Sequence, residues 1–307
     1  MLTKLYPMVQ FEKGTWEIDE FDCASLFLLE GTEKAMLIDC GMGIGDLRGA
    51  VEMITDKPLI VVITHGHVDH TGNARQFDEI WIHPKDQNKP IPQDTARRKF
   101  DTERIARRQK SSIGGYFTMF NLYPYDINVD LRGAEEYGNE PVIRDLYDGQ
   151  EFDLGGGRIV AAYECPGHSP GEMVFLDHQT RTLFCGDALN YNLGVGAVPV
   201  ETTLRYMKRL QDMGDQYDRI YNGHHDFRPL GMPLGGDCLP NVIAVLEDVL
   251  AGTATPCEMP SFWGQDVPLT WEKKPLLDGD GNPINRVLYH RGRNVVGVNM
   301  DHLWETK

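Results

Sequence analysis

An apolar stretch in the first quarter of the chain ends abruptly in groups that are costly to bury. Residues 61–73 read VVITHGHVDHTGN, so that apolar side chains are followed at once by His65, His67, Asp69 and His70. Moving imidazole and carboxylate groups out of water costs free energy unless they are hydrogen-bonded, paired or bound to an ion. Either these four side chains hold a ligand together, or the tract is an ordinary polar loop.

Short apolar segments recur along the chain, and many of them end in Gly, Asp or His. The segments expected to be strands are 25–30, 35–41, 59–66, 79–84, 158–167, 173–187 and 219–225. Helix-like segments lie between several of them, which predicts an α/β sandwich with helices covering the sheets. Because the strands lead into loops that carry His or Asp, we expect these loops to gather at one edge, where function commonly resides.

Net charge and cysteine spacing exclude several classes of protein. The 307 residues carry 30 Lys+Arg against 46 Asp+Glu, a formal charge of −16 that repels phosphate backbones and anionic membrane surfaces. Six scattered cysteines form no C-x-x-C pair, which argues against a thiolate zinc knuckle. The apolar runs are strand-sized and no leader is apparent, so we expect a cytoplasmic protein with no nucleic-acid or membrane partner and a small-molecule substrate.

Two segments stand outside the strand pattern. Residues 1–253 are expected to form one domain, in which residues 94–145 are a lid-like insertion with a basic helix followed by aromatic residues. Residues 254–307 are expected to form a C-terminal extension packed on the same domain. This extension contains a β-hairpin signal, NRVLYHRGRNVVGVNM. Its edge strand could pair with a second copy, which leaves a homo-oligomer open.

Three more ligand candidates follow apolar strands later in the chain. They are His168 in CPGHSPGE, Asp187 in LFCGDAL and His224 in YNGHHD. Neutral imidazole and carboxylate suit zinc, and also iron or manganese. Alternating side chains at a strand-to-helix junction can diverge toward two points, so two divalent ions are expected, zinc first, with iron or manganese as alternatives.

The order of these motifs resembles the metallo-β-lactamase superfamily, the αββα four-layer metallohydrolases that include glyoxalase II-like thioesterases. The similarity covers residues 20–250 or so and includes a strand that ends in Asp39. The resemblance implies that Asp39 holds the ligand loop by hydrogen bonds. It also implies two metal sites joined by a bridging Asp187. The implied ligands are His65, His67 and His168 for one ion, and Asp69, His70 and His224 for the other.

His225, beside His224, leaves the last ligand open between the two. The residue that directly follows the glycine is favoured, so His224 is taken as the ligand and His225 as a residue that could line the pocket.

The expected chemistry is hydrolysis by a hydroxide that two neighbouring ions generate from water. Asp69 is expected to orient the nucleophile and take part in proton transfer, and either a metal-bound water or Tyr191 to assist the leaving group. A small ester, thioester or lactone is the favoured substrate. A phosphodiesterase of small phosphoesters is the first alternative. A persulfide dioxygenase-like enzyme with a single iron is the second.

Overall fold

The computed structural model describes residues 5–20, 24–87, 140–224, 228–257 and 284–305. Most of the expected 94–145 insertion, together with His225, lies outside the described residues. The last four residues of that insertion, Val142–Asp145, form an edge strand of the first sheet. Among the described residues, no helix is both long and apolar enough to cross a bilayer.

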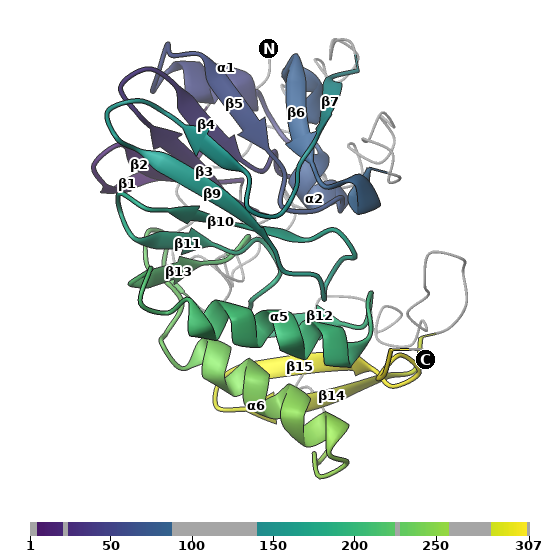
Figure 1. The fold of residues 1–307 in the computed structure, drawn as a ribbon. Coiled ribbons are helices and arrows are strands. Elements are labelled where there is room, and N and C mark those ends of the chain that lie inside the picture. Colours follow the sequence, from purple (N-terminus) through teal and green to yellow (C-terminus); the bar gives the residue numbers. More distant parts are fainter. Residues whose placement is uncertain (1–4, 21–23, 88–139, 225–227, 258–283, 306–307) are drawn as a thin grey trace, which may run out of the picture.

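A seven-stranded sheet forms the N-terminal half of the protein (Figure 1). Its first four strands pair antiparallel and the last four pair parallel, so β4 to β7 share one carboxyl edge. In spatial order its strands are β1 (Met8–Glu12), β2 (Thr15–Asp19), β3 (Ser25–Glu30), β4 (Ala35–Ile38), β5 (Leu59–Val62), β6 (Glu79–Ile82) and β7 (Val142–Asp145).

The second sheet has five strands and faces the first (Figure 1). Strands β9, β11 and β13 run in one direction, because β10 is antiparallel to both β9 and β11 while β13 is parallel to β11. In spatial order its strands are β13 (Arg219–Tyr221), β11 (Thr182–Phe184), β10 (Met173–Asp177), β9 (Ile159–Glu164) and β8 (Glu151–Asp153).

Alternation of side chains along the strands divides the interior into layers. In β3, Phe27 and Leu29 face the second sheet, whereas Leu26 and Leu28 face outward into the cluster that holds α1 (Leu47–Glu52). The expected αββα arrangement is confirmed, since helices also cover the outer face of the second sheet. The short helices of the ligand region are α2 (Val68–Thr71), η1 (Ala74–Gln76) and η2 (Pro84–Asp86).

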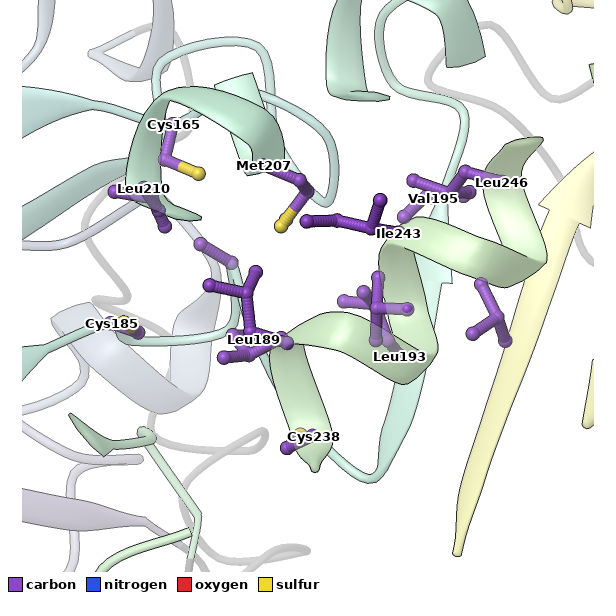
Figure 2. Close-up of a cluster of buried hydrophobic side chains, with 14 of the residues drawn as sticks. Cys165, Cys185, Leu189, Leu193, Val195, Met207, Leu210, Cys238, Ile243 and Leu246 are labelled. Carbon is purple, nitrogen blue, oxygen red and sulfur yellow. The ribbon is translucent and has the colours of Figure 1, made fainter. Parts of the chain in front are cut away.

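Helices α5 (Val200–Asp212) and α6 (Cys238–Leu250) cover the second sheet and join it to a third. One cluster includes Cys165 and Cys185 near the second sheet, Met207 and Leu210 of α5, and Ile243 and Leu246 of α6 (Figure 2). The third sheet has the order β12 (Asn192–Val195), β15 (Asn294–Asn299) and β14 (Arg286–Arg291). The expected C-terminal hairpin is present, with Gly292 and Arg293 at its turn.

Phe27 links the two large sheets and offers a test of the shared core. Its ring contacts those of Phe11, Phe184 and Tyr221. We expect Phe27→Ala to lower the free energy of unfolding by about 3–5 kcal/mol, because it removes a large buried ring and leaves a cavity. Chemical denaturation measures the loss. Met53→Ala is the control, since Met53 is exposed and its replacement should change the free energy of unfolding by less than about 0.5 kcal/mol. Equal losses in the two variants would contradict the placement of Phe27 in the core between the sheets.

Candidate metal centre

The predicted ligands follow the carboxyl ends of strands that meet at one edge. His65 and its neighbours follow β5, while His168, Asp187 and His224 follow β9, β11 and β13. These strands run so that their carboxyl ends lie at the same edge, where open α/β sheets commonly bind ligands. Backbone hydrogen bonds fix the loops to one another: Gly223 donates to Gly186 O (2.7 Å), and Met173 donates to Thr64 O (2.8 Å).

The structure brings all seven predicted ligands together. The ligand atoms form three groups that share members, and within each group the atoms lie within 4.8 Å of one another. The groups are His65, His67 and His168; His65, His70 and Asp187; and Asp69, His70 and His224.

In the first group, three imidazole nitrogens converge. His67 Nδ1 lies 2.9 Å from His65 Nε2 and 3.0 Å from His168 Nε2. The other nitrogen of His168 donates to Gly194 O (3.0 Å), and His65 Nδ1 faces Thr64 Oγ1 (3.1 Å) and Glu172 Oε1 (3.3 Å). These outer contacts keep the proton on Nδ1, so the inner Nε2 atoms present lone pairs. A single proton on His67 cannot bridge both neighbours, whereas a cation satisfies all three nitrogens.

The other two groups share His70. Its Nδ1 donates to Asp39 Oδ2 (2.8 Å), which leaves the buried Nε2 facing inward with no hydrogen-bond partner. Asp187 Oδ1 is also buried without a partner. Asp187 Oδ2 lies 3.3 Å from His224 Nε2 of the third group and 3.5 Å from His168 Nε2 of the first, and so lies between these two groups. Buried polar atoms without partners are rare in proteins, and these two fit ligands of divalent ions.

Charges within the cluster favour the metal-binding form of several of these ligands. Burial lowers the pKa of His65 well below its usual value, and also lowers that of His168, so both are neutral near pH 7. Burial opposes ionisation of Asp187, but the imidazoles of His224 and His70 outweigh it and lower the Asp187 pKa well below its usual value. Neutral imidazoles beside an ionised carboxylate are the species that metal coordination requires.

His70 differs from these ligands. Burial opposes its protonation, but Asp39 and Asp69 outweigh burial and raise the His70 pKa well above its usual value. An ion would therefore have to displace a proton there.

Asp39 takes the role expected for it. Its carboxylate accepts hydrogen bonds from Thr64 N (2.7 Å) and His70 Nδ1 (2.8 Å), and so connects the end of β4 to the ligand loop. Asp39 has a φ of 66°, in the left-handed region that residues other than glycine seldom adopt. Asp tolerates this region better than most residues, and its short side chain can bond locally there.

Glycine is required before His224 because the backbone passes close to the ligands. A Cβ on Gly223 would lie 2.7 Å from His70 Cε1 and 3.1 Å from Asp187 Oδ1. Arg228, four residues after His224, forms a buried ion pair in which its Nη2 donates to Glu17 Oε1 (2.8 Å). Arg228 also donates to Asn222 Oδ1 (2.7 Å), just before Gly223. This contact fixes the end of β13 from which His224 projects.

Two buried carboxylates of the framework were not predicted. Glu172 accepts hydrogen bonds from Asp187 N (3.0 Å) and Ser169 N (3.2 Å), in addition to its contact with His65. Asp86 accepts from Gly66 N (3.0 Å) and Ser169 Oγ (2.5 Å). Glu172 lies in the CPGHSPGE segment, so the signal for it was a glutamate four residues after His168; Asp86 had no comparable signal.

Tyr191 is placed differently from the expectation that it assists the leaving group. It is buried in the cluster beneath α6, and its hydroxyl accepts a hydrogen bond from Gly235 N (2.7 Å). The guanidinium of Arg293 lies 4.5 Å from the centre of its ring. These contacts give Tyr191 a role in joining β12, the start of α6 and the hairpin turn.

The sequence model of the metallo-β-lactamase superfamily matches residues 21–224. The chain belongs to this superfamily. It is similar to the human acyl-coenzyme A thioesterase MBLAC2, with 25% identity over 221 residues that cover 66% of this chain and 72% of that protein. It is also similar to an atrochrysone carboxyl ACP thioesterase of Aspergillus fumigatus, with 34% identity over 115 residues that cover 36% of this chain and 34% of that protein.

Solved structures agree on the superfamily fold. A metallo-β-lactamase from Pontibacter korlensis superposes with a TM-score of 0.53 at 16% identity, over 80% of this chain and 100% of that one. The sec-alkylsulfatase Pisa1 from Pseudomonas sp. gives a TM-score of 0.51 at 18% identity, over 80% of this chain and 42% of that one. The match of the superfamily sequence model confirms the resemblance inferred from the motif order, and at these identities the structures bear on the fold alone.

The buried carboxylates that contact the ligands provide a test of the framework. We expect Asp39→Asn and Glu172→Gln each to weaken metal binding by about 10–100-fold, because an amide keeps the size but replaces one acceptor oxygen with a donor. Competition with a chromogenic chelator measures the affinity, and circular dichroism checks the fold. Glu52→Gln is the matched control, because Glu52 is exposed on α1. Unchanged affinity in both framework variants would contradict this role.

Proposed function

We propose that this protein is a dinuclear metal-dependent thioesterase that hydrolyses small acyl thioesters. One observation carries the proposal: Asp187 Oδ2 lies 3.5 Å from His168 Nε2 of the first ligand group and 3.3 Å from His224 Nε2 of the third. A carboxylate in this position can bridge two ions. The thioesterase names of the relatives, from human and fungal sources, support the choice of substrate class.

His65, His67 and His168 would hold one ion, Asp69, His70 and His224 the other, and Asp187 would contact both. When bound, such ions act as Lewis acids and lower the pKa of a coordinated water. Imidazole and carboxylate ligands suit zinc, with iron or manganese as alternatives.

Asp69 is the residue of the site best placed to handle a proton. Burial opposes its ionisation, but the charges of His70 and His224 outweigh it and lower the Asp69 pKa, so the group is a carboxylate at neutral pH. Its Oδ2 lies 3.6 Å from His224 Nε2, and its side chain is partly exposed, within reach of a substrate. We assign Asp69 to orienting the attacking water and accepting its proton as the new carbon–oxygen bond forms.

The leaving group favours a thioester over an ester or lactone. A thiol has a pKa of about 8.5, so a thiolate can depart near neutral pH without a strong acid beside it. An alkoxide is far more basic and needs a proton donor. One of the donors expected from the sequence, Tyr191, is buried in the cluster beneath α6, where its hydroxyl contacts Gly235 N. Cleavage of the carbon–sulfur bond gives a carboxylate and a thiolate, which takes up a proton from solvent.

Replacement of the bridging carboxylate tests the proposed function. We expect the metal-loaded protein to release thiol from small acyl thioesters such as acetyl- and butyryl-coenzyme A, and Asp187→Ala to lower kcat/KM by about a hundredfold or more. Metal analysis should give two ions per chain before the substitution and fewer after it. Asp56→Ala, at an exposed aspartate, is the control and should match the parent protein.

Several outcomes would reject the proposal. Full turnover after Asp187→Ala would exclude the bridging role. Preferential cleavage of small phosphodiesters would favour the phosphodiesterase alternative. A single iron per chain with dioxygen uptake would favour the persulfide dioxygenase alternative.

A further inference from the structure

Two glycines lie side by side on neighbouring strands of the third sheet and leave a row with no side chains across them. Gly194 of β12 and Gly297 of β15 are register partners in the parallel pair. Their neighbours Leu193 and Val296 point into the cluster beneath α6, so the two glycines lie on the opposite face of the sheet. Interior glycines weaken a strand and often mark a place where another group approaches closely.

The side chain of Arg286 occupies this row. A Cβ on Gly297 would lie 2.0 Å from Arg286 Nε, and one on Gly194 would lie 3.1 Å from Arg286 Nη2. The side chain therefore extends from β14 across β15 to β12, and its guanidinium ends at the far strand. Any larger residue at position 297 would collide with it.

The strand that Arg286 reaches is the one that supports His168. Gly194 O accepts the hydrogen bond from His168 Nδ1 (3.0 Å). Farther along, Gly196 N and Ala197 N both donate to Gly167 O (3.1 and 3.2 Å), directly before His168. One residue of β12 thus contacts the guanidinium from the sheet face and a metal-ligand candidate from its edge, which places the cation beside the centre.

Arg286 differs from the other arginines of the hairpin in its charge environment. Arg291 pairs with Asp248 (3.4 Å) and Arg293 with Asp237 (3.2 Å). No carboxylate among the described residues pairs with Arg286, and removal of water by the surrounding protein lowers its pKa. Its side chain is nevertheless accessible to solvent. An accessible cation that is partly desolvated and unpaired is a favourable partner for an incoming anion.

We propose that Arg286 is a specificity residue that binds an oxyanion group, phosphate or carboxylate, of the substrate. A planar guanidinium recognises either group through two parallel hydrogen bonds. The oxyanion can belong to the thiol half of a thioester, as in the phosphates of coenzyme A, or to a carboxylate at the end of the acyl chain. This inference rests on the proposed thioesterase function. The hairpin that carries Arg286 lies outside the segment matched by the superfamily, residues 21–224.

Four thioesters distinguish the sources of the anion. Acetyl-coenzyme A carries phosphates only, succinyl-N-acetylcysteamine a carboxylate only, succinyl-coenzyme A both, and acetyl-N-acetylcysteamine neither. We expect Arg286→Gln to raise KM about 10–100-fold either for the two substrates that carry phosphates or for the two that carry a carboxylate. The kcat values, and the KM for the uncharged acetyl-N-acetylcysteamine, should not change. Arg291→Gln is the matched control, because it removes the same charge from the same strand. Metal content should be equal in all three proteins.

A binding measurement keeps this test separate from the proposed function. Calorimetric titration of the metal-loaded protein with coenzyme A and with succinate should show a loss of about 10–100-fold in affinity for one of them in Arg286→Gln, and none in Arg291→Gln. A parent protein that binds in this way but cleaves no thioester would reject the proposed function and retain the anion site. Equal binding by both variants, or an equal loss of activity on the uncharged thioester, would overturn the role of Arg286.

Discussion

Inward-facing lone pairs of buried imidazoles and carboxylates are the constraint on which the rest of this structure depends. A buried polar atom without a partner costs about 1–3 kcal/mol. His70 Nε2 and Asp187 Oδ1 are both in that position, and the imidazoles of His65 and His168 present their Nε2 atoms to His67. Such an arrangement is stable only if the surrounding protein holds it firmly and an ion offsets its cost.

Three carboxylates provide most of that support. Asp39 joins β4 to the ligand loop, Glu172 joins the His168 loop to Asp187, and Asp86 joins Gly66 to Ser169. Glu172, through His65, and Asp86 connect the two sheets, in addition to the backbone hydrogen bond from Met173 N to Thr64 O and the hydrogen bonds that the buried Arg158 donates to Gly14 O and Glu30 O. The third sheet adds a further support at His168 through Gly194 O, so the C-terminal hairpin contributes to the centre although it lies far away in sequence.

The convergence of the seven candidate ligands and the layered fold could be predicted because both leave local signals in the sequence. His65, His67, Asp69 and His70 lie within six residues, and short apolar strands that end in His or Asp indicate which edge carries the site. The partners of Glu172 could not be predicted, because one glutamate near a histidine does not reveal that it reaches residues 65 and 187. Tyr191 shows the converse: proximity to Asp187 in sequence suggested a catalytic role, whereas packing beneath α6 directs its hydroxyl to Gly235. The path of Arg286 over two glycines depends on strand register, which the sequence does not specify.

The most direct test of the central claim is anomalous diffraction from a crystal of the zinc-loaded protein, with data collected on both sides of the zinc edge. Two peaks should appear, one among His65, His67 and His168 and the other among Asp69, His70 and His224, with Asp187 between them. A single peak, or peaks away from these side chains, would contradict the proposal that this cluster holds a pair of ions.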